Sequence, residues 1–180
     1  MTDSQTNEMD TPKDSSDKPL EQPKPIGYAV SNLKFSLMIV LTLGYYVIWW
    51  AYKNYRALQI PGPNKLGSVV YAVFFPISFF NLLKGVEAEA VSHDIPFRLN
   101  KLLVAVMYFL FITATKIFVR NEETVLIALI TAIISLIIVF FGHREVLEVN
   151  RKIGAYIDSK LTWKDFVFIV IALVAAFTIG

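Results

Sequence analysis

The sequence contains no cysteine, only two histidines and comparatively few charges, and each shortage excludes a class of function. Without cysteine, the chain has no disulfide framework, no thiolate nucleophile and no cysteine-based metal site. Charged residues make up 18% of the 180 residues, below the quarter that is usual for a soluble domain, while hydrophobic residues make up 55%. The charges lie between long apolar runs, which is the composition of a multi-pass membrane protein.

Four apolar segments are long enough to cross a bilayer as helices, because a span needs about 20 residues. They are residues 35–52, 102–119, 125–141 and 163–180. Residues 1–30 form an acidic tail that we expect to be disordered, because it cannot bury enough apolar surface to offset the entropy of ordering. The sequence therefore predicts an all-α integral membrane protein, with one transmembrane helical domain over residues 31–180.

A fifth apolar segment, residues 67–91, allows two interpretations. Pro76 lies near its middle and removes a backbone donor, so we expect a kink there. Beyond Pro76, apolar residues recur at helical spacing at Phe79, Leu82 and Val86, which is typical of an amphipathic helix in the membrane interface. The segment is either a re-entrant or interfacial hairpin, which we prefer, or a fifth span.

Charges in the connecting segments predict the orientation. Loops 84–101 and 142–164 carry three and five basic residues, whereas the turn 120–124 carries one base and two acids. Because basic loops stay in the cytoplasm, we expect both loops to be cytoplasmic and the C-terminus to be outside. A hairpin at 67–91 would place the N-terminal tail outside, and a fifth span would place it inside. Bases beside apolar segments suit anionic lipid headgroups rather than nucleic acid, so the expected partner is the lipid bilayer.

The run TLGYYVIWWAYKNYR, residues 42–56, carries six aromatic rings and then turns basic. On a helix, Tyr45 and Trp49 share one face, while Tyr46 and Trp50 share another. Tyrosine and tryptophan favour the membrane–water interface, so the run is typical of a membrane exit whose deeper rings pack on neighbouring helices. The functional alternative is an aromatic cleft formed by these four side chains for a lipid, a quinone or a cation.

Lys116 is the one charge that interrupts a long apolar run, and intramembrane charges are candidate functional groups. It lies near the segment end, so its side chain can also reach the interface. A functional Lys116 would line a polar pocket with Thr113 and Thr115. Thr131 and Ser135 are the other candidate intramembrane polar residues, as part of a permeation path.

Small residues recur at helical spacing in two of the segments, at Ala128 and Ala132 and at Ala172, Ala175 and Ala176. Small residues let helix backbones approach closely in lipid. We therefore expect the segments 125–141 and 163–180 to pack against each other through these faces.

The two histidines are His93 and His143, in the two basic loops. Glu89 and His93 have the spacing of two metal ligands on one helix side, so a metal site that joins both loops is conceivable. Solvated surface side chains are the simpler interpretation. No nucleotide-binding or hydrolase motif is present, so we expect no enzyme activity, no cofactor and no bound metal.

The first apolar segment resembles that of a family of small uncharacterised bacterial inner-membrane proteins. The shared pattern is Lys-Phe, then Thr-Leu-Gly-Tyr, then Trp and Tyr-Lys-Asn; here these are Lys34, Phe35, Thr42, Leu43, Gly44, Tyr45, Trp49, Tyr52, Lys53 and Asn54. Members often carry arginine where this chain has Tyr71. The resemblance implies a bacterial cytoplasmic membrane location and brings no activity, substrate or catalytic residue.

Two functions remain open from the sequence. The first is a non-enzymatic accessory or scaffold module that acts through helix packing with a membrane-protein partner or as a homo-oligomer. The alternative is a small oligomeric transporter or channel, which would need buried polar groups or broken helices near the middle of the membrane.

Overall fold

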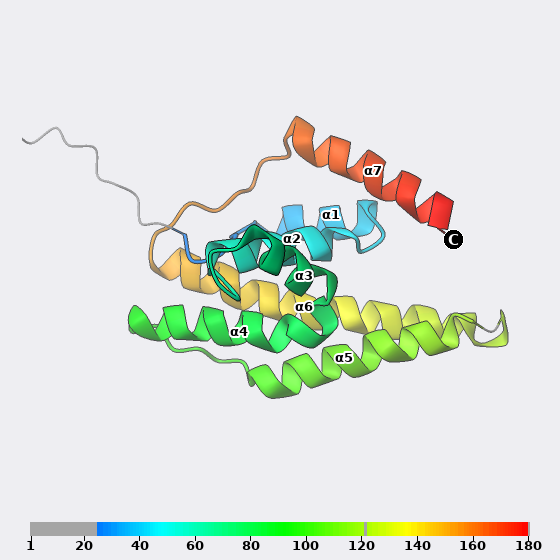
Figure 1. The fold of residues 1–180 in the computed structure, drawn as a ribbon, viewed down its shortest axis with the longest axis horizontal. Helices are drawn as coiled ribbons and strands as arrows, with labels where there is room; N and C mark the ends of the chain where they lie inside the picture. Colours follow the sequence, from blue (N-terminus) through cyan, green and yellow to red (C-terminus); the bar gives the residue numbers. More distant parts are fainter. Residues whose placement is uncertain (1–24, 121, 180) are drawn as a thin grey trace, which may run out of the picture.

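The computed structural model describes residues 25–120 and 122–179, and every regular element within these residues is a helix (Figure 1). Residues 1–24 of the predicted tail and Gly180 of the predicted last span lie outside the described residues. The elements are α1 (Asn32–Leu41), α2 (Tyr46–Ala57), α3 (Lys65–Val73), α4 (Phe75–Ser92), α5 (Lys101–Phe118), the short 3-10 helix η1 (Glu122–Thr124), α6 (Val125–Lys152) and α7 (Trp163–Ile179). The predicted all-α class is confirmed.

The prediction of one continuous helix over residues 35–52 is wrong, because the chain reverses between α1 and α2. Leu43 and Gly44 adopt left-handed φ values of 51° and 90°, and the Gly44 N–H closes α1 by donating to the Ile39 carbonyl at 2.8 Å. The Phe35 ring then lies 5.4 Å from the Trp50 ring, although these residues would be about 22 Å apart on a straight helix. Helices α1 and α2 therefore form a hairpin.

The segment 67–91 is also broken, two residues before Pro76. Helix α3 ends at Val73 and α4 begins at Phe75, with Pro76 in its first turn. The Ser78 hydroxyl donates to the Tyr71 carbonyl at 2.6 Å, whereas these two residues would be about 10 Å apart along the axis of a straight helix. The sharp bend that proline predicts is present. It is displaced toward the N-terminus because proline is tolerated in the first turn of a helix.

Helices α5 and α6 form a long antiparallel pair, joined through η1 (Figure 1). Both are long and apolar enough to cross a membrane: Lys101–Phe118 has a mean hydropathy of 1.8, and the most apolar 18 residues within Glu122–Lys152 have a mean of 3.0. Their outward faces expose apolar side chains, including Leu110, Leu126 and Ile130. They coincide with two of the four predicted spans. Helix α6 continues to Lys152, so residues 142–152 are helical rather than part of a loop.

Aromatic side chains fill the space between the hairpins and the α5–α6 pair. Phe35, Trp50, Phe75 and Phe79 are all buried, and the Phe75 and Phe79 rings both contact the ring of Tyr108 from α5. Gly142 lets α4 approach α6, since a Cβ atom at this position would lie 2.7 Å from Phe79 Cζ. The centre of the molecule is therefore a packed aromatic core.

Residues 25–30 pack on the helices, although the sequence assigns them to the tail. Asn150 of α6 accepts a hydrogen bond from the Ile26 N–H at 2.8 Å and donates to the Ile26 carbonyl at 2.6 Å. Asn54 of α2 accepts from the Tyr28 N–H at 3.0 Å. Ile26 and Val30 are buried because they are apolar, unlike the polar residues before them. The start of the described chain is thereby fixed beside the C-terminal end of α6.

Most ionisable side chains lie at one of the two ends of the helices. Of the lysines and arginines in 25–180, twelve lie toward the end formed by residues 25–34, 53–65, 84–101 and 144–165, together with seven acids. The opposite end, at the turn between α5 and α6, holds two bases, Lys116 and Arg120, and two acids, Glu122 and Glu123. We call the first end the basic end.

Helix α7 lies beside α1 and α2 rather than in contact along α6 (Figure 1). The prediction that the small faces of 125–141 and 163–180 pack together is therefore wrong. Ala128 and Thr131 of α6 are buried on the side of α5, where the Thr115 hydroxyl donates to the Thr131 hydroxyl at 2.9 Å. Small residues allow close approach to any neighbour, so their spacing does not identify the partner.

Candidate functional site

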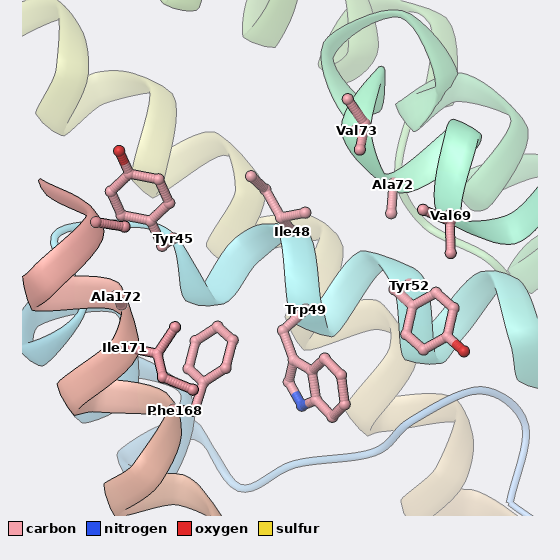
Figure 2. A pocket seen from close by; sticks show the side chains of 11 residues that line it. Tyr45, Ile48, Trp49, Tyr52, Val69, Ala72, Val73, Phe168, Ile171 and Ala172 are labelled. Carbon is pink, nitrogen blue, oxygen red and sulfur yellow. The ribbon is translucent and has the colours of Figure 1, made fainter. Parts of the chain in front are cut away.

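A groove of about 480 Å³ runs over α2 between α3 and α7. Figure 2 shows its floor, made by side chains of α2, with α3 on one flank and α7 on the other. The lining is almost entirely apolar, and it consists of Tyr45, Ile48, Trp49, Tyr52, Val69, Ala72, Val73, Phe168, Ile171, Ala172 and Ala175. The small side chains of Ala72 and Ala172 create the space, because larger ones at these buried positions would fill it.

Two of the four predicted aromatic-cleft residues line this groove and two do not. Tyr45 and Trp49 lie on the groove face of α2, where the Trp49 ring is 5.8 Å from the Phe168 ring of α7. Tyr46 and Trp50 do not line the groove and are completely buried. The division follows the two helix faces that the sequence spacing predicts, and packing explains the second pair.

A second pocket of about 450 Å³ adjoins the groove toward the basic end, and we call it the charged pocket. The two share Trp49, Phe168 and Ile171. Its other lining residues are Tyr28, Lys34, Met38, Tyr46, Lys53, Asp158, Thr162, Lys164, Asp165 and Val167. The groove and the charged pocket are therefore neighbours, one apolar and the other charged, and Trp49, Phe168 and Ile171 lie between them.

A buried ion cluster holds the charged pocket together. The Lys34 ammonium donates to Asp158 Oδ2 at 2.9 Å and to the Lys160 carbonyl at 2.8 Å, and it lies 3.0 Å from Asp165 Oδ2. Asp165 also accepts two bonds from Thr162. The cluster connects α1 to the segment 153–162 and to the first turn of α7, so it positions α7 beside α2.

The cluster shifts the protonation equilibria of its members. Burial alone would lower the pKa of Lys34, but the bonds to Asp158 and Asp165 outweigh burial, and the pKa is raised. Burial, together with the neighbouring Asp158 carboxylate, raises the pKa of the Tyr28 phenol, whose hydroxyl donates to Asp158 Oδ2 at 3.0 Å. Near neutral pH, Lys34 is therefore charged and Tyr28 is a neutral donor.

Two cations at the charged pocket remain without a carboxylate. The Lys53 ammonium lies over aromatic faces, 4.9 Å from the Trp49 ring centroid and 5.8 Å from that of Tyr28. Neither Lys53 nor the exposed Lys164 forms an ion pair with any residue that the structure describes. Tyr46 also lines this pocket, and its buried hydroxyl lies next to the Tyr28 phenol.

A third pocket, of about 480 Å³, lies where the tips of both hairpins meet α5 and α6. Its lining includes Gly44 and Pro76 from the tips, and Lys116 and Ser135 from the long helices. Of the predicted intramembrane polar residues, Thr131 is turned away and donates to the Ala128 carbonyl at 2.9 Å. Lys116 and Ser135 are thus brought to one pocket, and we call it the tip pocket.

The histidines do not come together as a two-loop metal site would require. His143 is buried in the aromatic core and stacks on the Phe35 ring at 3.9 Å, whereas His93 is exposed at the end of α4. Neither ring nitrogen of His143 has a hydrogen-bond partner among residues 25–120 and 122–179. Within the same residues, no group of three His, Cys, Asp or Glu side chains could hold a metal ion.

Sequence reasoning did not find the Lys34–Asp158–Asp165 cluster. Lys34 is 124 residues from Asp158 in the chain, and no local pattern connects the two. One signal was present: Lys34 stands directly before an uncharged run, where a lysine needs either water or a carboxylate partner. No family model, no curated protein and no solved structure matches this chain.

Proposed function

We propose that the chain is a multi-pass protein of the bacterial cytoplasmic membrane that acts without catalysis, as an accessory or scaffold module. In this arrangement α5, α6 and α7 cross the bilayer, while the α1–α2 and α3–α4 hairpins enter from the basic end and return to it. This arrangement has three crossings and two re-entrant hairpins instead of four crossings and one hairpin, because the first apolar segment is broken at Leu43 and Gly44. The family resemblance of residues 33–56 supports the bacterial location.

The segregation of charge carries this proposal. Of the fourteen basic side chains that the structure describes, twelve lie at one end of the helices, while the outward faces of α5, α6 and α7 expose leucine, isoleucine, valine and phenylalanine. Exposed apolar faces of this extent suit lipid rather than water. The basic end is expected in the cytoplasm, since positive loops are retained there. Three crossings then place the C-terminus outside, and residues 25–31 in the cytoplasm.

The aromatic core supports a module without a transport path. Phe35, Trp50, Phe75 and Phe79 fill the region between the basic end and the tip pocket, and each is at most 2% exposed. A solute path along the hairpins would have to pass through these rings. A packed centre with a groove on its outer side is better suited to binding a neighbour within the membrane than to conducting a solute through itself.

A pull-down in mild detergent from native membranes tests the accessory function. We expect one membrane-protein partner, recovered at a fixed stoichiometry with the tagged full chain. Recovery of the chain alone as a homo-oligomer, with solute uptake or conductance after reconstitution into liposomes, would contradict the proposal.

A small oligomeric transporter or channel is the second candidate, and the tip pocket favours it. Transport proteins often bind solutes where broken helices meet near the middle of the membrane. Here two helix breaks and Lys116 line one pocket. If this candidate is right, Lys116→Met abolishes anion flux in liposomes while leaving abundance unchanged, and Lys84→Met, on the exposed side of α4, retains it.

A further inference from the structure

The groove and the charged pocket have the chemistry of a single amphipathic ligand. Asp165 lies in the charged pocket and Ala175 in the groove, ten residues apart on α7, so the site extends about 15 Å along this helix. Trp49 stands at the junction of the two parts, and tryptophan favours the membrane–water boundary. The apolar part is therefore directed toward the bilayer core, with the charged part at the headgroup level of the basic end.

The free hydrogen-bonding capacity in the charged pocket is complementary to an anion. Both carboxylates are engaged internally, Asp158 by Lys34 and Tyr28, and Asp165 by Lys34 and Thr162. The charged groups without such a partner among the described residues are the ammonium groups of Lys53 and Lys164. A phosphate ester would supply the negative charge that the two lysines lack.

We infer that this site binds one anionic phospholipid, with its phosphate at Lys53 and Lys164 and one acyl chain in the groove between α2, α3 and α7. The inference rests on the proposed membrane insertion and names a ligand for it. The lining residues Ile48, Val73 and Ile171 are exposed, so the groove is open on its outer side and a lipid can enter laterally from the bilayer. The apolar lining binds the chain without selecting it, and the two lysines select the charge of the headgroup.

The test measures lipid binding to the purified full chain in mild detergent by native mass spectrometry. The probes are phosphatidylglycerol and phosphatidylcholine with identical acyl chains. We expect one phosphatidylglycerol to bind more tightly than phosphatidylcholine. Each lysine near anionic lipid contributes about a fivefold change in affinity, so Lys53→Gln with Lys164→Gln weakens phosphatidylglycerol binding about 30-fold. The control Lys84→Gln, an exposed lysine outside both pockets, leaves the affinity unchanged.

A second pair of variants tests the apolar part. Ala172→Phe fills the groove and weakens binding of both lipids, whereas Val174→Phe, on the exposed side of α7, does not. The inference is overturned if the chain binds the two lipids with equal affinity. It is also overturned if Lys84→Gln weakens phosphatidylglycerol binding as much as the double lysine variant does. The lysine variants decide the question even if Ala172→Phe does not fold, because both side chains are outside the core.

Failure of the inference is distinguishable from failure of the proposed function. Membrane fractionation of the wild-type chain is the separate measurement. If the chain is recovered in the aqueous fraction, the membrane proposal itself is wrong. If it is integral to the membrane and shows no headgroup preference, the lipid site alone is wrong.

Discussion

Lys34 connects α1 to α7, so its removal is the most informative single change in the fold. The Lys34→Met variant keeps an unbranched side chain of similar length and removes the ammonium group. Two carboxylates would then lose their cation, and the Lys160 carbonyl would lose a donor at 2.8 Å. The side chain of Lys34 is only 2% exposed, while those of Asp158 and Asp165 are 23% and 10% exposed.

The size of the effect follows from this burial. Removing one partner of a buried ion pair costs about 3–5 kcal/mol, because the other charge stays buried without compensation. Asp158 reaches water in part, so we expect the lower end, about 3 kcal/mol, which is roughly a 100-fold change in the unfolding equilibrium. The triple variant Lys34→Met, Asp158→Asn, Asp165→Asn removes all three charges, and it should recover most of the loss.

The measurement is equilibrium unfolding in mixed detergent micelles, followed by tryptophan fluorescence. Lys101→Met is the matched control, because Lys101 pairs with Glu87 while both side chains are 31% exposed. That pair should contribute at most about 1 kcal/mol. Equal losses for Lys34→Met and Lys101→Met, or no recovery in the triple variant, would refute the buried-cluster account.

Three further predictions concern single positions. The stability difference between wild type and Lys34→Met should be constant from about pH 6 to 9 and shrink only above about pH 10.4. The pKa of Lys34 is raised in the folded chain, so the ion pairs contribute fully below the pKa of the unfolded chain, and their contribution is lost as the pH rises through the pKa of the folded chain. A difference that disappears by about pH 8 would contradict the pairing. Asn150→Ala leaves the Ile26 N–H and carbonyl unpaired, at about 1–3 kcal/mol for each buried group, and hydrogen exchange of the Ile26 amide should accelerate at least about tenfold. Gly142→Ala places a methyl group against Phe79 and should cost about 1–3 kcal/mol in the same unfolding assay, whereas no loss would show that α4 and α6 are less closely packed.

The parts of the fold that local pattern determines were predictable. The helices over 102–119 and 125–141 follow from long apolar runs, which Lys116 alone interrupts, since a helix that satisfies its own backbone is the structure that such a run adopts in lipid. The division of Tyr45 and Trp49 from Tyr46 and Trp50 follows from helical periodicity alone. The break near Pro76 follows from the missing backbone donor.

The remaining features depend on contacts between distant segments. Hydropathy does not distinguish a span from a hairpin of two shorter helices, so the reversal at Leu43 and Gly44 was missed. Because residues 35–52 are also broken into a hairpin, a hairpin at 67–91 no longer places the start of the described chain outside. Residues 25–31 and 57–64 lie at the same end. The partner of α7 is determined by Lys34, which no spacing within residues 163–180 could reveal.

The topology of the first hairpin tests the account most directly, and the absence of native cysteine makes single-cysteine labelling clean. Pro25→Cys, Ala57→Cys and Ser92→Cys each place a thiol at an exposed position on the basic end, and Glu122→Cys places one at the opposite end. With a membrane-impermeant maleimide, the account predicts that the first three variants react only after the cytoplasmic side is opened, and that the Glu122→Cys variant reacts in intact cells. Labelling of the Ala57→Cys and Pro25→Cys variants from opposite sides would show that residues 35–52 cross the membrane, and it would contradict the re-entrant hairpin.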